Sequence, residues 1–147
     1  MLAQAIKKRL SKEENQKGFT LIELLAVIVI LGIIAVIAIP LIGNIINNSK
    51  EDADKATAKQ IADAARLYVV GAEQGDFSDK DEVTLGTIQG ANYIDSGLVL
   101  PSTKVALDTT NTIVEFSEDG TLVSVTLDPA PKGVTDGKYT AAELNKD

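Results

Sequence analysis

The chain has 147 residues, and its 21 acidic and 14 basic residues give a formal net charge of −7. It contains no cysteine, which excludes a disulfide, and no histidine, the commonest general base and metal ligand. We therefore expect no enzymatic activity, no cofactor and no bound metal ion. A serine–lysine pair such as Ser102 and Lys104 is formally available for catalysis, but such pairs occur by chance and no oxyanion site is suggested nearby.

The first eighteen residues are basic. Two glutamates, Glu13 and Glu14, stand among five basic residues: Lys7, Lys8, Arg9, Lys12 and Lys17. Because basic residues that flank a membrane segment stay on its cytoplasmic side, we expect residues 1–18 in the cytoplasm. The residues after Gly43, which are predominantly acidic, are then expected outside.

An apolar segment runs from Phe19 to Leu41, and only Thr20, Glu23 and Gly32 interrupt it. About 20 such residues in a helix cross a hydrocarbon core of roughly 30 Å. This length predicts a single-pass membrane helix over residues 19–46.

The position of Gly18 distinguishes this segment from an ordinary secretory signal. Such a signal has an apolar core of about 7 to 15 residues, with its cleavage site behind the core. Here the small residue that suits a peptidase, Gly18, stands before the core and directly after Lys17. Cleavage after Gly18 would remove a basic leader, residues 1–18, and keep the membrane helix in the mature chain.

Glu23 is an acid inside the apolar segment. A lone carboxylate at that depth costs roughly 2.5 to 3.5 kcal/mol, so such acids usually serve a function and have a cationic partner. The alternative is a single-pass anchor that tolerates the acid.

Gly32 and Pro40 are the second irregularity of the apolar segment. Proline lacks an N–H and clashes with the carbonyl four residues back, that of Val36, and glycine loosens the helical backbone. We expect the helix to be flexible between Gly32 and Pro40, with a static kink as the alternative.

Residues 17–25 read Lys-Gly-Phe-Thr-Leu-Ile-Glu-Leu-Leu and resemble the type IV pilin family, which includes the pseudopilins of type II secretion and competence systems. Prepilins of this family carry a short basic leader that ends in glycine, a class III signal peptide. The resemblance implies that a prepilin peptidase cuts between Gly18 and Phe19 and N-methylates Phe19. It also implies that the Phe19 amine neutralises Glu23 during assembly. Many members carry Gly32 and Pro40 at these places, which implies a stretch that partly unwinds.

The resemblance further implies a structural subunit that assembles through its N-terminal helix into a type IV pilus, or fimbrium, for adhesion, twitching motility or DNA uptake. Its partners would be identical subunits in a helical filament, the prepilin peptidase, the assembly platform and minor pilins. The prepilin would lie in the inner or cytoplasmic membrane, and the assembled pilus would be extracellular. Two alternatives are a pseudopilin of a type II secretion or competence system and a monomeric membrane-anchored binding module. The lack of cysteine resembles pilins of Gram-positive bacteria.

Residues 47–75 predict an amphipathic second half of the same helix. Small and apolar residues recur there at spacings of three and four and form one stripe, whereas charged residues lie largely off it. The stripe comprises Ala53, Ala56, Thr57, Ile61, Ala64, Ala65, Tyr68 and Ala72. The charged residues off the stripe are Glu51, Asp54, Lys55, Lys59, Asp63 and Arg66.

Residues 76–147 predict a globular domain with a polar C-terminal tail. Strand-like runs rich in valine, isoleucine, threonine and leucine predict an antiparallel meander. These runs are Thr103–Leu107, Thr112–Ser117 and Thr121–Leu127. The pair Asp119-Gly120 predicts a hairpin turn between the last two. Four side chains are expected to face the helix stripe: Val114, Phe116, Val123 and Val125.

The rest of this domain gives weaker signals. Residues 79–93 predict a short helix or an ordered loop, and a further strand is expected near Tyr139. Thr140 and Glu143 have the spacing of a capping box, with a disordered tail as the alternative. Together these features predict an α+β fold, in which a long N-terminal α-helix packs against a small antiparallel β-sheet.

Charge bears on the partners as well. Removal of the leader takes away five basic and two acidic residues, so the net charge falls from −7 to −10. Such a chain repels nucleic acid unless basic residues gather in one patch, and four lysines are scattered along the sequence: Lys104, Lys132, Lys138 and Lys146. We therefore expect no direct nucleic-acid binding.

An acidic run invites a calcium interpretation. It comprises Asp76, Asp79, Asp81 and Glu82. Its spacing is not that of an EF-hand loop, so we expect a solvated, charged loop and no metal site.

Overall fold

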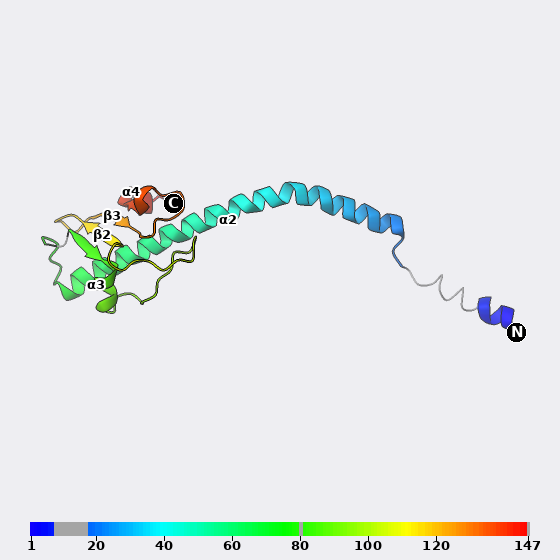
Figure 1. Ribbon diagram of the computed structural model, residues 1–147, viewed down its shortest axis with the longest axis horizontal. Coiled ribbons are helices and arrows are strands. Elements are labelled where there is room, and N and C mark those ends of the chain that lie inside the picture. Colours follow the sequence, from blue (N-terminus) through cyan, green and yellow to red (C-terminus); the bar gives the residue numbers. More distant parts are fainter. Residues whose placement is uncertain (8–17, 80, 147) are drawn as a thin grey trace. The chain divides into compact units, whose positions relative to one another are not determined.

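Residues 1–7, 18–79 and 81–146 are described by the computed structural model of the chain (Figure 1). Most of the expected leader, residues 8–17, lies outside the described residues. The chain divides into two compact units, Met1–Asn44 and Ile45–Asp147, the second of which we call the head. The expected division into residues 1–18, 19–46, 47–75 and 76–147 stays a prediction.

The first unit is helical. Residues 2–7 form a helix, residues 18–20 have no regular structure, and α2 begins at Leu21. α2 (Leu21–Ala72) has 52 residues, continues through Gly32 and Pro40, and ends in the head.

The head contains a four-stranded sheet in the order β1-β2-β3-β4, with every neighbouring pair antiparallel. The strands are β1 (Glu82–Thr84), β2 (Ile113–Phe116), β3 (Leu122–Thr126) and β4 (Lys138–Thr140). Three short helices connect or follow them: α3 (Leu85–Gly90), the 3₁₀ helix η1 (Thr135–Gly137) and α4 (Ala141–Leu144). The expected α+β fold, a long helix on a small antiparallel sheet, is confirmed.

The core of the head lies between α2 and one face of this sheet. Ile61 and Val69 of α2 are fully buried, as are Val114 of β2 and Val125 of β3. Each such aliphatic side chain contributes roughly 1.5 to 3 kcal/mol by leaving water. The buried positions between Ile61 and Val69 on α2 are alanines, which let the sheet approach the helix backbone closely.

The buried face of α2 is rotated from the predicted stripe. Ile61, Ala64 and Ala65 are buried as expected, but Ala56 and Ala72 are exposed. The structure instead buries four residues outside the predicted stripe: Asp54, Ala58, Ala62 and Val69. Alanines occur on all sides of this part of the helix, so their positions do not indicate which face is buried. The bulkier Ile61 and Val69, eight residues apart, decide the orientation.

The predicted strand Thr103–Leu107 is wrong. That run forms a bridge between Val99 and Ala106, and Leu100 N–H donates to the Val105 carbonyl at 2.8 Å. This loop therefore folds on itself, and the first strand of the sheet is β1. Sequence patterns missed β1 because it has three residues, begins in the acidic run and leads directly into α3.

The hairpin between β2 and β3 is confirmed, but one of its predicted core residues is not. Gly120 has a φ of +80°, and its N–H donates to the Ser117 carbonyl at 2.8 Å. Val123, however, is 47% exposed. Phe116 pairs with Leu122 after Glu115 has paired with Ser124, so Val123 is the extra residue of a β-bulge and turns outward.

The C-terminal segment is ordered through α4. Tyr139 pairs with Val125 and is buried, and Thr140 caps α4 in a capping box with Glu143. Both the expected strand near Tyr139 and the expected capping box are confirmed. The alternative of a disordered tail is wrong for residues 138–144.

Candidate functional site

The predicted cleavage bond precedes α2. Gly18, Phe19 and Thr20 have no regular secondary structure, and Phe19 is 83% exposed. A Cβ added at Gly18 would meet no atom within 4 Å. The packing of the chain therefore does not require glycine at this position, and the Gly18–Phe19 bond lies in an accessible segment.

Thr20 and Glu23 close the start of α2. The Thr20 N–H and hydroxyl donate to Glu23 Oε2 at 2.7 and 2.9 Å, and the Glu23 N–H donates to Thr20 Oγ1 at 3.3 Å. These reciprocal bonds are a capping box. Sequence reasoning found Glu23 but missed this role for Thr20, although the Thr-x-x-Glu spacing was the signal.

The capping box leaves one carboxylate oxygen of Glu23 open. Within the described part of the chain, no hydrogen bond to Oε1 of Glu23 is present. The carboxylate lies at the N-terminal end of the helix, where the helix dipole favours a negative charge. After cleavage at Gly18, the new amine would belong to Phe19, the residue next to Thr20. Glu23 is thus fixed near the new terminus with an oxygen available to a cation.

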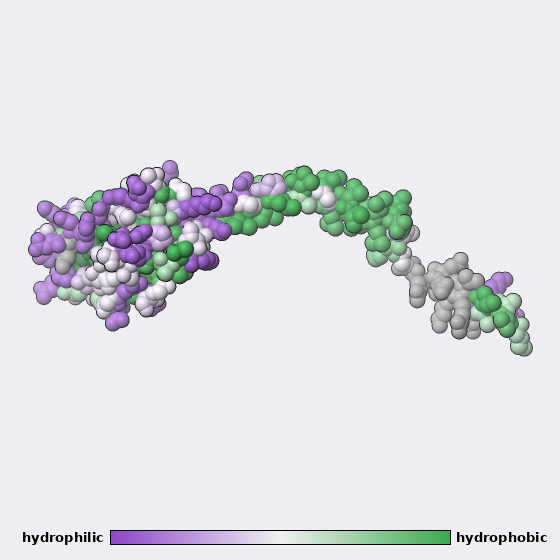
Figure 2. Space-filling view, viewed as in Figure 1, coloured by the Kyte–Doolittle hydropathy of each residue, from purple (hydrophilic) through white to green (hydrophobic). Residues whose placement is uncertain are grey.

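The first part of α2 exposes its apolar side chains. The large apolar residues from Leu21 to Ile46 are exposed, between 48% at Ile46 and 87% at Leu21. Figure 2 shows this apolar surface in green along the first part of the helix. α2 is long and apolar enough to cross a membrane, and no part of its apolar window is buried. Lipid or other protein chains must therefore cover it.

Gly32 and Pro40 lie within this exposed stretch. A Cβ added at Gly32 would meet nothing within 4 Å, so the helix has no packing reason for glycine there. Pro40 has no N–H to donate to the Val36 carbonyl. Flexibility of the helix between these two residues stays a prediction, with a static kink as the alternative.

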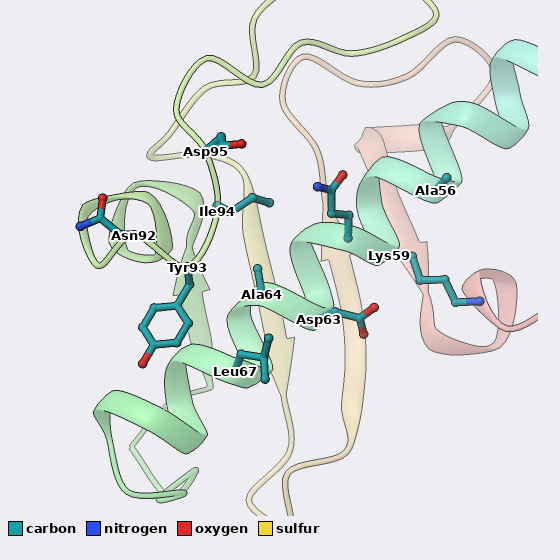
Figure 3. A pocket seen from close by; sticks show the side chains of 10 residues that line it. Ala56, Lys59, Asp63, Ala64, Leu67, Asn92, Tyr93, Ile94 and Asp95 are labelled. Carbon is teal, nitrogen blue, oxygen red and sulfur yellow. The ribbon is translucent and has the colours of Figure 1, made fainter.

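A groove of about 570 Å³ runs between α2 and residues 92–95 of the head. Figure 3 shows Tyr93 on one wall of it and Leu67, Ala64 and Asp63 of α2 on the other. Tyr93 is fixed by an edge-to-face contact with Tyr68 at 5.8 Å. The lining residues include no serine, cysteine or histidine, so the groove holds no Ser–His or Cys–His pair.

Asp54 was expected among the charged residues off the stripe that faces the head, but the structure places it on the buried face of α2. Asp54 is fully buried, and its Oδ1 accepts a hydrogen bond from the Ser102 N–H at 3.0 Å. Neither Asp54 Oδ2 nor Ser102 Oγ, both buried, has a hydrogen-bond partner within the described residues. Asp54 therefore connects α2 to the loop of residues 98–107. Burial, together with the negative charges of Asp54, Glu51 and Glu143, raises the pKa of Tyr139 to about 12.

The fold brings together charged residues of the head that lie far apart in the sequence. Three lysines described as scattered, Lys132, Lys138 and Lys146, line one hollow together with Lys55, which corrects that description. In the acidic run, the Ser78 N–H donates to Asp76 Oδ1 at 3.0 Å. Over residues 1–7, 18–79 and 81–146, no three acidic, histidine or cysteine side chains gather to hold a metal ion.

A family model described as the prokaryotic N-terminal methylation motif matches residues 15–39. This segment contains Gly18, Phe19, Glu23 and Gly32. Searches of curated proteins and of solved structures found no match. The motif match confirms the resemblance drawn from residues 17–25 and with it a class III signal peptide. The motif is typical of type IV pilins and pseudopilins, which are structural proteins and not enzymes, and this supports the expectation of a chain without enzymatic activity. Neither finding bears on a Gram-positive source, which stays a prediction.

Proposed function

We propose that this chain, a type IV pilin-like protein by its class III signal peptide and its fold, is the structural subunit of a pilus filament. The exposed apolar part of α2 carries the proposal. Lipid would cover its side chains before assembly. After the helix leaves the membrane they need another apolar cover, and a bundle of identical helices supplies one. A membrane-anchored monomer would need neither Gly18 before the apolar segment nor Glu23 within it.

In this proposal the chain is made as a prepilin and cut by a prepilin peptidase between Gly18 and Phe19, and Phe19 is N-methylated. The exposure of Phe19 and the absence of helix at residues 18–20 support cutting at this bond. Because the chain itself does not need glycine at position 18, the requirement for a small residue belongs to the peptidase. Gly18→Ala is therefore expected to be cut, and Gly18→Leu is not.

Glu23 serves assembly in this proposal. An α-amino group has a reference pKa of about 7.7 to 8.0, so the Phe19 amine is mostly cationic at neutral pH. The open Oε1 of Glu23 gives such a cation an acceptor, within the subunit or on its neighbour. This pairing would compensate the cost of a carboxylate in lipid and draw each new subunit into register. The Gly32–Pro40 stretch would lengthen the subunit as the filament forms.

The location and partners follow from the same proposal. Before assembly, the prepilin is a single-pass protein of the inner or cytoplasmic membrane with its N-terminus in the cytoplasm. An assembly platform and minor pilins then build it into an extracellular filament for adhesion, motility or DNA uptake. In DNA uptake we expect another subunit to contact the DNA, because this head is acidic.

A pseudopilin of a type II secretion or competence system is the second candidate. The motif match over residues 15–39 supports it as well, because this N-terminal segment is common to pilins and pseudopilins. A pseudopilin would use the same cleavage and the same Glu23 but form a short piston.

Electron microscopy of fibres sheared from the producing cells, with mass spectrometry of the subunit, tests the proposal. Long fibres whose subunit begins at methylated Phe19 are expected. A processed subunit that stays in the membrane fraction without fibres would favour the pseudopilin. A subunit that retains residues 1–18 would refute both.

A further inference from the structure

The basic residues of the head gather at one end of it. Residues 45–147 contain nine basic and eighteen acidic residues. Six of the nine line three adjoining hollows near the start of the head's part of α2, the one shared with β4 having a volume of about 460 Å³. These six are Lys50, Lys55, Lys59, Lys132, Lys138 and Lys146. We call them the basic end.

Five lysines of the basic end have no ion-pair partner among the described residues. The exception is Lys138, whose Nζ lies 2.8 Å from Glu115 Oε2. Glu51, Asp52 and Glu143 are the acids that line the same hollows, so positive charges are in excess there. In a head with twice as many acids as bases, this excess sets the surface apart.

The opposite end of the head is acidic. Residues 73–82, which follow α2, carry five acids and one lysine in their sequence, and the turn of residues 117–120 adds two acids. The ring of Phe77 packs on that of Phe116 at 5.4 Å, and the Phe116 N–H donates to the Asp81 carbonyl at 3.2 Å. These contacts hold the two segments side by side. We call them the acidic end.

The two ends are separated by the length of the helix between them. Seventeen residues lie from Lys55 to Ala72, which is about 26 Å at a rise of 1.5 Å per residue. Figure 1 shows α4, which ends two residues before Lys146, beside α2 and away from the point where α2 ends. The head therefore has two poles of unlike charge.

We propose that the basic end of one head binds the acidic end of a second copy of this chain. The inference rests on the proposed function, because subunits meet in this way only when they assemble. A contact between two different surfaces of the same protein repeats along a filament when the rotation between neighbouring copies does not close a ring. Complementary charge fixes the register of such a contact more than its affinity, which the apolar helices supply.

A second head fits the basic end better than a long polyanion does. Nucleic acid carries a continuous row of charges and would run on over the acidic remainder of the head. The acidic end is compact, exposed at Asp79 and Glu118, and of the sign that the lysines require. A ladder in the cross-linking test below would therefore show that the occupant is a second head and not a polyanion.

Cysteine cross-linking tests the contact directly, because the chain has no cysteine of its own. Lys132→Cys and Glu118→Cys alter exposed residues at opposite ends of the head. Fibres of the double variant, treated with a short bismaleimide, are expected to give a ladder of covalent multimers. Each single variant should give no ladder. Lys132→Cys with Asp63→Cys, an exposed acid midway along the head's part of α2, is the matched control.

Charge reversal supplies a second measurement. Lys132→Glu with Lys146→Glu, or Glu118→Lys with Asp79→Lys, is expected to reduce the yield of sheared fibres by roughly tenfold, because each places like charges in contact. All four residues are exposed, and their side chains make no hydrogen bond among the described residues. The four changes together should restore the yield, since they exchange the two signs.

The outcomes separate this inference from the proposed function. Wild-type fibres without a ladder in the Lys132/Glu118 double variant, or with an equal ladder in the Asp63 control, would overturn the head-to-tail contact and leave the filament standing. The contact would also be overturned if the fourfold variant gave no higher yield of sheared fibres than the two twofold variants. Absence of wild-type fibres would overturn both.

Discussion

Gly137→Ala is expected to destabilise the head through a clash that glycine alone avoids. Gly137 joins η1 to β4, is buried and has a φ of +66°. Its carbonyl accepts a hydrogen bond from the Leu127 N–H at 2.9 Å. A Cβ at this position would lie 2.1 Å from the Leu127 carbonyl oxygen and 3.2 Å from the Ala130 Cα. Both are backbone atoms, so the chain itself would have to move.

Gly133→Ala is the matched control, four residues earlier in the same loop. Gly133 also has a positive φ, +87°, but an added Cβ would meet only Glu51 Oε1, at 3.8 Å. Both variants carry the backbone strain of alanine in the left-handed region, about 1 to 2 kcal/mol. Only Gly137→Ala adds the cost of forcing atoms into a filled space, about 1 to 3 kcal/mol. The difference between the two free energies of unfolding therefore measures the clash.

Thermal unfolding of the full chain in detergent gives this difference. The three tyrosines of the chain, Tyr68, Tyr93 and Tyr139, all lie in the head, so near-ultraviolet circular dichroism follows the head and not the apolar helix. One kcal/mol shifts the midpoint by about 4 to 8 °C in a domain of about 100 residues. Gly137→Ala is expected at least about 4 °C below Gly133→Ala. Equal midpoints would refute the close approach of Gly137 to Leu127.

Three further predictions concern the assembly residues and the sheet. Glu23→Ala is expected to be processed normally but to form no fibres, as judged by mass spectrometry and microscopy, and normal fibres would refute the charge-neutralisation account. Thr20→Ala removes the hydroxyl of the capping box and should weaken the helix start by about 1 kcal/mol, with a lower fibre yield, whereas Thr20→Ser should match wild type; equal yields for both would deny Thr20 a role in positioning Glu23. Hydrogen bonds from Lys138 and Ser124 lower the pKa of Glu115, so the ionised pair stabilises the head at neutral pH and this contribution is lost as the pH falls through that lowered pKa. Glu115→Gln is then expected to cost less than about 1 kcal/mol at pH 7 and less still near pH 2, and a larger cost in acid, measured from urea midpoints, would contradict the sign.

Periodic and motif-based features of this chain were predictable from the sequence. The apolar length of residues 19–46 predicted the membrane-length helix, and the Asp119-Gly120 pair predicted the hairpin. Both signals depend on local chemistry, apolar content and turn geometry, that tertiary contacts do not override. The Thr140–Glu143 capping box belongs to the same class. Its counterpart at Thr20 and Glu23 has the same spacing, but an acid inside an apolar segment points first to a cationic partner and not to a helix cap.

Features that depend on long-range pairing were not predictable in this way. β1 is three residues long, and it is a strand because it pairs with β2. In this pairing Val83 lies opposite Val114, which is 31 residues later in the sequence. The bulge at Val123 shifts a side chain outward without any change in the local alternation of residues. The lysines of the basic end come from the start of the head's helix and from the C-terminal segment, so only the fold brings them together.

The capping box at Thr20 and Glu23 also determines what cleavage can change. Its side-chain bonds join Thr20 to Glu23, and the Leu24 N–H donates to the Thr20 carbonyl at 3.1 Å. All of these atoms lie after the Gly18–Phe19 bond. The precursor and the mature chain can therefore begin the same helix with the same bonds, without refolding at the membrane surface. In the proposed function, processing would then act as a change of charge, in which the basic leader is exchanged for one amine beside a carboxylate that is already in position.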